Sequence, residues 1–290
     1  MKKIIVAISV IVIMICVFGC SAGSQNVDVV ATTKPVYDFT AFLCSGTGIA
    51  VQQLITENVS CLHDYTLQVR QMRAIEGADT VVVSGAGLEE FLHDALQSAN
   101  TVIDASEGID LHCGEHHHEE DGHHHDGDPH IWLSTDNARK MAENICQGLC
   151  QRYPECAKTF TENLSSLNLE FDLLKIYGQA AMANIQQRNL ITFHDGFSYF
   201  AEEWDLNILR AVEEESGSEA SAAELIELIE LIRQYELAAI FTEENGSTSA
   251  AQIIANETGV SIYTLNMGMS DQDYFETMYH NIDTVKEALG

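Results

Sequence analysis

The 290-residue chain has few basic side chains, since 14 Lys and Arg stand against 44 Asp and Glu, for a formal net charge of −30. Such an imbalance repels phosphate backbones through long-range Coulomb forces and excludes nucleic acid as a partner. Apolar residues are not scarce: a hydrophobic content of 46% suffices for a packed core and fits two modest domains better than one large domain. The composition therefore indicates a folded, acidic protein.

The chain also lacks a comfortable membrane span. The apolar run from Ile4 to Phe18 follows Lys2 and Lys3, and it is shorter than the roughly 20 apolar residues that a span needs. This pattern predicts a signal peptide over residues 1–19. The segment that ends it, Val-Phe-Gly-Cys, looks like a bacterial lipoprotein cleavage box, so we expect lipidation of Cys20 and a tether over residues 20–25. A plain secreted protein is the alternative, and both interpretations place the protein outside the cytoplasm.

Six cysteines remain besides Cys16 and Cys20, namely Cys44, Cys61, Cys113, Cys146, Cys150 and Cys156. An even number outside the cytoplasm suggests disulfides, but six cysteines allow about 15 pairings that the sequence cannot separate. Cys146 and Cys150 are one helical turn apart, which is more typical of two thiols on one buried face than of a bridge. We expect at least some of the six to be small core residues.

Short β-branched runs alternate with segments of helical periodicity, which predicts an α/β fold with mostly parallel sheets. We expect strands near residues 27–32, 80–83, 190–193, 208–212, 238–242 and 260–265, and helices near 36–44, 88–95, 136–152, 222–235 and 274–289. Residues 154–187 keep near-helical spacing, with Gly178 as the one weak point. A helix that long spans about 45 Å and suits a link between two lobes. We therefore expect α/β lobes over residues 26–153 and 188–290, joined by a single long backbone helix.

Three separate histidines carry the candidate chemistry. His63, His130 and His194 each follow or end a strand-like segment, and open α/β folds place ligands at the carboxyl ends of their strands. Three neutral imidazoles supply most of a tetrahedral shell for Zn²⁺. Each histidine also has a carboxylate nearby (Asp64, Asp128 and Asp195) that could orient the ligating ring. A single loop histidine is more often an ordinary surface residue, so the prediction depends on all three converging.

A second group of histidines lies in a segment that could not fill a core. Residues 112–128 consist almost entirely of His, Glu, Asp and Gly, with histidines at His112, His116, His117, His118, His123, His124 and His125. We expect a solvated loop that binds several metal ions weakly, because ordering a flexible loop costs conformational entropy. The alternative is an acidic loop with no role in binding.

These motifs resemble the metal-binding receptors of bacterial zinc and manganese ABC importers, over most of the chain from about Val27 to Leu289. The resemblance is carried by residues 78–89, by Asp-Pro-His-Ile-Trp-Leu at 128–133 and by Phe-His-Asp-Gly-Phe-Ser-Tyr-Phe at 193–200. In that family the second and third motifs hold metal ligands, and the segment around His63 looks like the first ligand loop. The histidine-rich loop is similar to the zinc-importing branch. The resemblance implies two lobes with the ion held between them, a membrane permease as partner, and a monomer.

The chain departs from the family pattern at the fourth ligand. An acidic residue is common in the C-terminal lobe at the position where this chain has Asn266, whose amide oxygen is a poor donor to Zn²⁺. Water or another acid such as Glu243 could complete the shell. A set rich in imidazole disfavours Mn²⁺, which prefers oxygen ligands.

Two alternatives remain from other functional classes. An extracellular zinc hydrolase would need similar ligands, but no His-Glu-x-x-His segment occurs. A metal-storing or adhesive surface lipoprotein would mainly use the histidine-rich loop. We favour a receptor that is not an enzyme.

Overall fold

The computed structural model describes residues 27–57, 59, 62, 65–112, 127–212 and 220–290. Several sequence predictions fall on residues outside this part of the chain: the signal peptide, Cys20, Cys61, His63, Cys113 and all loop histidines except His112. None of the helices in the described residues is long and apolar enough to cross a membrane.

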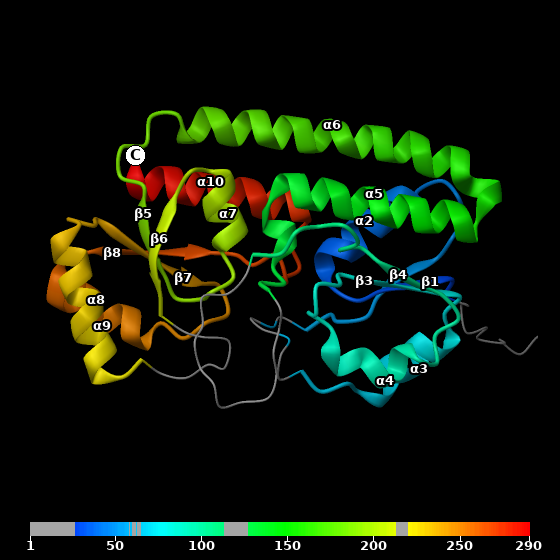
Figure 1. Cartoon of the computed structure of the whole chain (residues 1–290), viewed down its shortest axis with the longest axis horizontal. Coiled ribbons are helices and arrows are strands. Elements are labelled where there is room, and N and C mark those ends of the chain that lie inside the picture. The colour runs from blue at the N-terminus through cyan, green and yellow to red at the C-terminus, as the bar shows by residue number, and fades with distance from the viewer. Residues whose placement is uncertain (1–26, 58, 60–61, 63–64, 113–126, 213–219) are drawn as a thin grey trace, which may run out of the picture.

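The N-terminal lobe is built on a four-stranded parallel sheet in the order β2-β1-β3-β4. Its strands are β1 (Val29–Ala31), β2 (Val51–Gln53), β3 (Thr80–Val83) and β4 (Val102–Asp104). Helices α2 (Lys34–Cys44) and α5 (Thr135–Arg152) lie on one face, and α3 (Val69–Gly77) and α4 (His93–Leu96) lie on the other, as Figure 1 shows. The β1 and β3 side chains are buried because parallel strands with helices on both faces have no solvated side.

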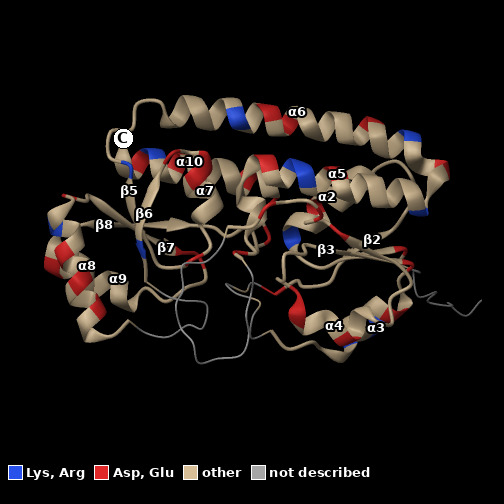
Figure 2. Cartoon of the chain, in the orientation of Figure 1, with Lys and Arg blue, Asp and Glu red and all other residues tan. Residues whose placement is uncertain are grey.

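The C-terminal lobe repeats this arrangement with the order β6-β5-β7-β8, again all parallel. Its strands are β5 (Asn189–Thr192), β6 (Asn207–Ala211), β7 (Ala239–Glu243) and β8 (Ser261–Leu265). Its helices are α7 (Ser198–Glu203), α8 (Ala222–Gln234), α9 (Ser249–Thr258) and α10 (Tyr274–Leu289). On α8, acidic positions outnumber basic ones in Figure 2, as the net charge leads one to expect.

A short 3₁₀ turn, Pro154–Cys156, leads into the long helix α6 (Ala157–Met182), which runs across both lobes in Figure 1. The helix is shorter than the predicted 154–187 segment because the chain turns after Met182, whose carbonyl accepts a hydrogen bond from the Arg188 guanidinium (3.0 Å). Gly178 is required where it lies, since a Cβ there would be 2.2 Å from the Trp204 ring. The two-lobe α/β prediction is confirmed.

Direct contacts also join the lobes beneath α6. The Trp132 indole N–H donates to the Met267 carbonyl (2.7 Å), and the Tyr274 hydroxyl donates to the Trp132 carbonyl (3.0 Å). The backbone N–H of Tyr274 donates to Asp38 (3.0 Å). Because one hydrophobic core continues from the first sheet through these residues into the second lobe, the lobes are held in a fixed relation, which favours small tilts over wide closure.

Most of the predicted elements agree with the structure to within two residues, and the exceptions are the long helix and the helix expected at 88–95. The helix expected at 88–95 is a 3₁₀ turn (Glu90–Leu92) followed by the single turn of α4. Among the described cysteines, Cys44 and Cys146 are buried and Cys150 and Cys156 are partly exposed, and all four are free thiols. Burial raises the pKa of Cys44 to about 12, which fits the expected role of a small core residue.

Candidate metal centre

The candidate ligands of the C-terminal lobe lie where its strands end. His194 follows β5 by two residues, Glu243 is the last residue of β7, and Asn266 directly follows β8. Strands β5 and β7 are neighbours in the middle of the sheet, with β6 on the outer side of β5 and β8 on the outer side of β7. His194 and Glu243 therefore flank the topological switch point, the usual ligand site of an open parallel sheet.

His130 belongs to the other lobe and immediately precedes the 3₁₀ turn Ile131–Leu133. The residue is 4% exposed. Its Nδ1 lies 2.8 Å from Oδ1 of Asp128, and the same oxygen accepts the His130 backbone N–H at 2.9 Å. A carboxylate on one ring nitrogen fixes the ring and directs the other nitrogen, Nε2, toward a ligand. The sequence-based expectation that Asp128 orients His130 is confirmed.

The charge on Asp128 is stabilised despite its burial. Burial raises its pKa, but hydrogen bonds from His130 and Ser198 and the charge of His130 outweigh this, so that the pKa lies below its ordinary value. Asp128 is therefore a carboxylate at neutral pH, able to accept the hydrogen bonds that fix the His130 ring.

The two histidines meet across the lobe boundary. The ring centroids of His130 and His194 are 5.2 Å apart and the ring planes are nearly perpendicular, at 89°. His194 is 7% exposed, so both imidazoles are sheltered from bulk water. The structure thus brings together two of the three predicted histidine ligands.

Glu243 lies on the same side of the site as His194. Its Oε2 is 3.9 Å from Nε2 of His194, and the residue is 4% exposed. Two donors bound to one tetrahedral zinc ion lie roughly 3.4 Å apart. A small approach of the two side chains would therefore let both bind one ion.

The other ring nitrogen of His194, Nδ1, accepts the backbone N–H of Gly196 at 2.9 Å. A neutral ring that accepts at Nδ1 carries its proton on Nε2. A metal ion bound through Nε2 would require the neutral ring to carry its proton on Nδ1 instead, so that the hydrogen bond from Gly196 would be given up.

Asn266 has a different environment. Its side-chain oxygen accepts the Gly268 N–H at 2.7 Å, and its NH₂ group donates to Glu244 (2.5 Å) and Ser270 (3.0 Å). Asn281 pairs with its backbone N–H and carbonyl. These contacts fit a residue that shapes the loop after β8, and the geometry favours Glu243 over Asn266 as the fourth donor.

His112, the first residue of the histidine-rich segment, is docked on α7. Its ring stacks on the Tyr199 ring at 4.0 Å, and its Nε2 lies 2.6 Å from a carboxylate oxygen of Glu202. The other loop histidines and His63 lie outside the described residues. Within the residues that are described, no three His, Cys, Asp or Glu side chains are close enough to hold a metal ion.

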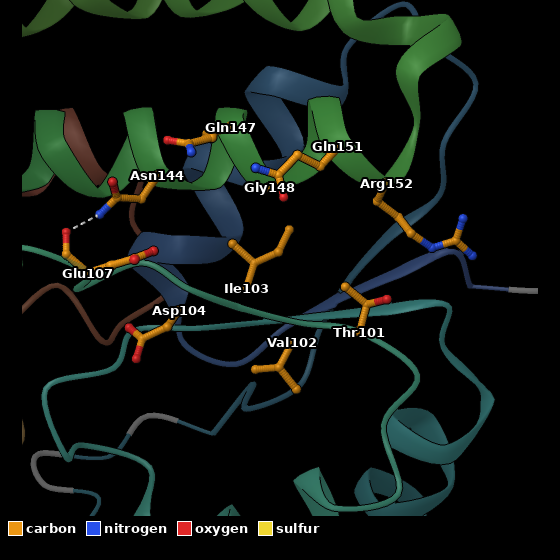
Figure 3. Close-up of a pocket in the computed structure, with 10 residues that line it drawn as sticks. All are labelled: Thr101, Val102, Ile103, Asp104, Glu107, Asn144, Gln147, Gly148, Gln151 and Arg152. Carbon is orange, nitrogen blue, oxygen red and sulfur yellow. Dashed lines mark hydrogen bonds between the residues drawn. The ribbon is translucent and has the colours of Figure 1, made fainter.

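A separate cavity of about 310 Å³ lies between β4 and α5, shown in Figure 3. Ile103 of β4 and Gly148 of α5 are among the residues that line it, and the Asn144 amide donates to the Glu107 carbonyl at 2.8 Å. The lining contains no histidine or cysteine. This cavity is thus a poor candidate for a transition-metal site.

Three residues near His130 have roles that the sequence alone did not assign, namely Gly196, Ser198 and Tyr199. They belong to the motif that contains His194, but they contact the other lobe. Their proximity in sequence to a candidate ligand was the available signal. The contact with His130 and Asp128 depends on how the lobes dock.

Residues 29–288 match the family described as zinc-uptake complex component A, periplasmic (ZnuA). The zinc-binding lipoprotein AdcA of Streptococcus pneumoniae serotype 4 is 29% identical over 310 residues, covering 99% of this chain and 61% of AdcA. The zinc-binding protein AdcA of Streptococcus pyogenes serotype M3 is 28% identical over 288 residues, covering 90% of this chain and 56% of AdcA. The chain therefore spans about three fifths of the length of these relatives.

Solved structures have the same fold. A crystal structure of ZnuA superposes with a TM-score of 0.81 at 27% identity, covering 92% of this chain and all of that one. Zn(II)-bound AdcA from Streptococcus pneumoniae gives a TM-score of 0.77 at 28% identity, covering 91% of this chain and 58% of that chain.

Proposed function

Because the chain belongs to the family of periplasmic zinc-uptake components, as its histidine motifs predicted, we propose that it is an extracytoplasmic receptor of an ABC importer. It captures Zn²⁺ in preference to Mn²⁺ between its two lobes and delivers the ion to a membrane permease. The zinc-binding AdcA relatives and the Zn(II)-bound AdcA structure support zinc as the ion.

The proposed ligands are His63, His130 and His194, with Glu243 as the fourth donor and Asn266 as its alternative. The observation that carries the proposal is the meeting of His130 and His194 from opposite lobes, with ring centroids 5.2 Å apart. Three nitrogens and one oxygen form a donor set suited to tetrahedral zinc, whereas Mn²⁺ prefers a shell of oxygens.

The rest of the chain takes supporting roles in this proposal. Residues 26–153 and 188–290 form the lobes and 154–187 the link, and the seven histidines from His112 to His125 form a weaker, secondary metal-binding segment. Cys20 carries the lipid that holds the monomeric protein at the outer face of the cell membrane. The AdcA relative that is named a lipoprotein supports the lipid anchor.

The chain has no catalytic role in this proposal. Membership in a family of uptake components supports a receptor over a zinc hydrolase or a storage or adhesive protein. Hydrolysis of esters or peptides that disappears when His130 and His194 are replaced would favour an enzyme instead.

Calorimetric titration with Zn²⁺ and Mn²⁺ tests the proposal on the purified protein and on a variant that lacks residues 115–125. We expect one tight zinc site that survives the deletion, together with weaker sites that vanish with it. Joint replacement of His63, His130 and His194 by alanine should abolish the tight site. Retention of tight zinc binding in that triple variant would refute the proposed ligand set.

A further inference from the structure

Two adjacent side chains on α7 contact both ends of the histidine-rich segment. The Ser198 hydroxyl donates to Oδ2 of Asp128 and lies 3.2 Å from Nδ1 of His112. The Tyr199 hydroxyl donates to the Asp128 carbonyl at 2.8 Å and accepts the His112 backbone N–H at 3.0 Å. Helix α7 belongs to the C-terminal lobe, whereas Asp128 precedes a ligand of the N-terminal lobe.

These contacts leave Asp128 fully engaged. Its Oδ1 holds the His130 ring and backbone, its Oδ2 accepts from Ser198, its carbonyl accepts from Tyr199, and its N–H donates to the His112 carbonyl at 2.9 Å. The Asp128 side chain is 13% exposed, and Tyr199 is 3% exposed. Hydrogen bonds sheltered from water are electrostatically stronger than exposed ones, and water cannot readily replace a partner that is lost.

The path from α7 to the proposed ligand is therefore short and continuous. Ser198 and Tyr199 fix Asp128, and Asp128 fixes the ring of His130, whose Nε2 is the proposed metal donor. The ring that would bind the ion from the N-terminal lobe is held in place by hydroxyl groups of the C-terminal lobe.

We propose that Ser198 and Tyr199 are positioning residues for metal capture, which make the donor geometry of His130 depend on the docking of the two lobes. This inference rests on the proposed function, because it names residues that tune the same site. It also provides a route to release: a movement of α7 away from Asp128 would loosen the carboxylate that orients His130 and would lower the affinity for the ion.

The test uses the full chain with Ser198→Ala, Tyr199→Phe and the double variant. Tyr199→Phe removes only the hydroxyl and keeps the ring that stacks on His112. Tyr177→Phe is the matched control, since it removes a comparable hydroxyl that donates to Asp283 (2.6 Å) on the outer side of α6 and α10. The zinc dissociation constant is measured by competition with a chromophoric chelator, the Co²⁺ complex by its visible absorption, and the metal-free protein by its melting temperature.

We expect the double variant to bind zinc about tenfold more weakly, within the range typical of lost outer partners of a ligating histidine. Its Co²⁺ absorption should shift, because the orientation of one donor has changed. Ser198→Thr keeps a hydroxyl and should keep the affinity, and Tyr177→Phe should match the wild type.

The outcomes separate this inference from the proposed function. If the wild type binds zinc tightly and the double variant binds it equally tightly with an unchanged Co²⁺ spectrum, the positioning role is wrong, whatever happens to the melting temperature. If the wild type has no tight zinc site that requires His130 and His194, the proposed function fails and this inference falls with it.

Discussion

Gly196 of the C-terminal lobe lies directly against the His130 ring of the N-terminal lobe. A Cβ on residue 196 would be 2.9 Å from both Cγ and Nδ1 of that imidazole and 2.3 Å from the terminal methyl of Met267. Only glycine allows this approach, and the Gly196 N–H also donates to His194. One residue therefore contacts both proposed histidine ligands.

Replacement of Gly196 by alanine should weaken zinc binding. The added methyl group would push the His130 ring away from Asp128, and we expect a loss of about tenfold or more in affinity, as for other disruptions of a ligand's support. A chelator competition assay measures it. Gly77→Ala is the control, because a Cβ at Gly77 meets nothing within 4 Å. Equal affinities in the two variants would contradict the close approach.

Substitutions of Glu243 and Asn266 should have different effects, because Glu243 is the proposed ligand and Asn266 stabilises the loop after β8. Glu243→Gln keeps the shape but removes the charge beside His194, so zinc affinity should fall by at least about tenfold. Asn266→Ala should instead lower the free energy of unfolding by about 1–3 kcal/mol, since the Gly268 N–H and Glu244 lose their partner. Calorimetry and urea denaturation of both variants check this. The reverse pattern would make Asn266 the better candidate for the fourth ligand.

Gly178 tests the packing of the long helix. Gly178→Ala should lower the free energy of unfolding by about 1–3 kcal/mol. The added Cβ would overlap the ring of Trp204, a buried residue that directly follows α7 and packs against α6. Denaturant unfolding of the metal-free protein measures the effect. Gln179→Ala, at the exposed neighbouring position, should leave stability within about 0.5 kcal/mol of the wild type. If Gly178→Ala left the free energy of unfolding unchanged, α6 and the residue that follows α7 could move apart at little cost.

Glu89 should give the metal-free protein a distinctive pH dependence. Burial raises its pKa from 4.5 to about 7, although Thr32, Ser84 and Gly85 donate hydrogen bonds to it. Between these two values the folded protein retains a proton that the unfolded chain releases. The free energy of unfolding should therefore fall as pH rises from about 4.5 to about 7, by about 3 kcal/mol in total.

Urea denaturation at several pH values, with Glu89→Gln beside the wild type, isolates this contribution. The variant should lose the part of the decrease that Glu89 contributes, whereas Glu203 and Asp38, whose pKa values are also raised by burial, contribute equally in both proteins. Asp128 does not interfere, because its lowered pKa places its own loss of stabilisation at more acidic pH. Parallel pH curves for the two proteins would rule out Glu89 as the source.

The sequence predicted well those strands and helices whose buried residues leave a clear apolar pattern. Strand β3 was predicted at its observed bounds, since Thr80 to Val83 are all buried. Strands β2 and β4 were missed, because each has three residues and is partly exposed. Helices α3, α7 and α9 were missed as well, since α7 has only six residues and α3 and α9 each bury only two side chains.

The site was predictable only in part, for a related reason. His194 stands out in sequence because it follows a strand-like run, and the carboxyl ends of strands are where such folds bind ligands. The same expectation for His130 was wrong, because His130 leads into a 3₁₀ turn and does not end a strand. The support from Gly196, Ser198 and Tyr199 acts across the lobe boundary. Local patterns contain no information about that docking, so these roles required the structure.

The position of the bound ion tests the account most directly. Diffraction from crystals of the zinc-loaded protein, with anomalous scattering measured at the zinc edge, would locate it. The account predicts a single strong peak between the lobes, within about 2.0–2.1 Å of Nε2 of both His130 and His194. Zinc found only on the segment from 112 to 128, with these two rings unligated, would contradict it.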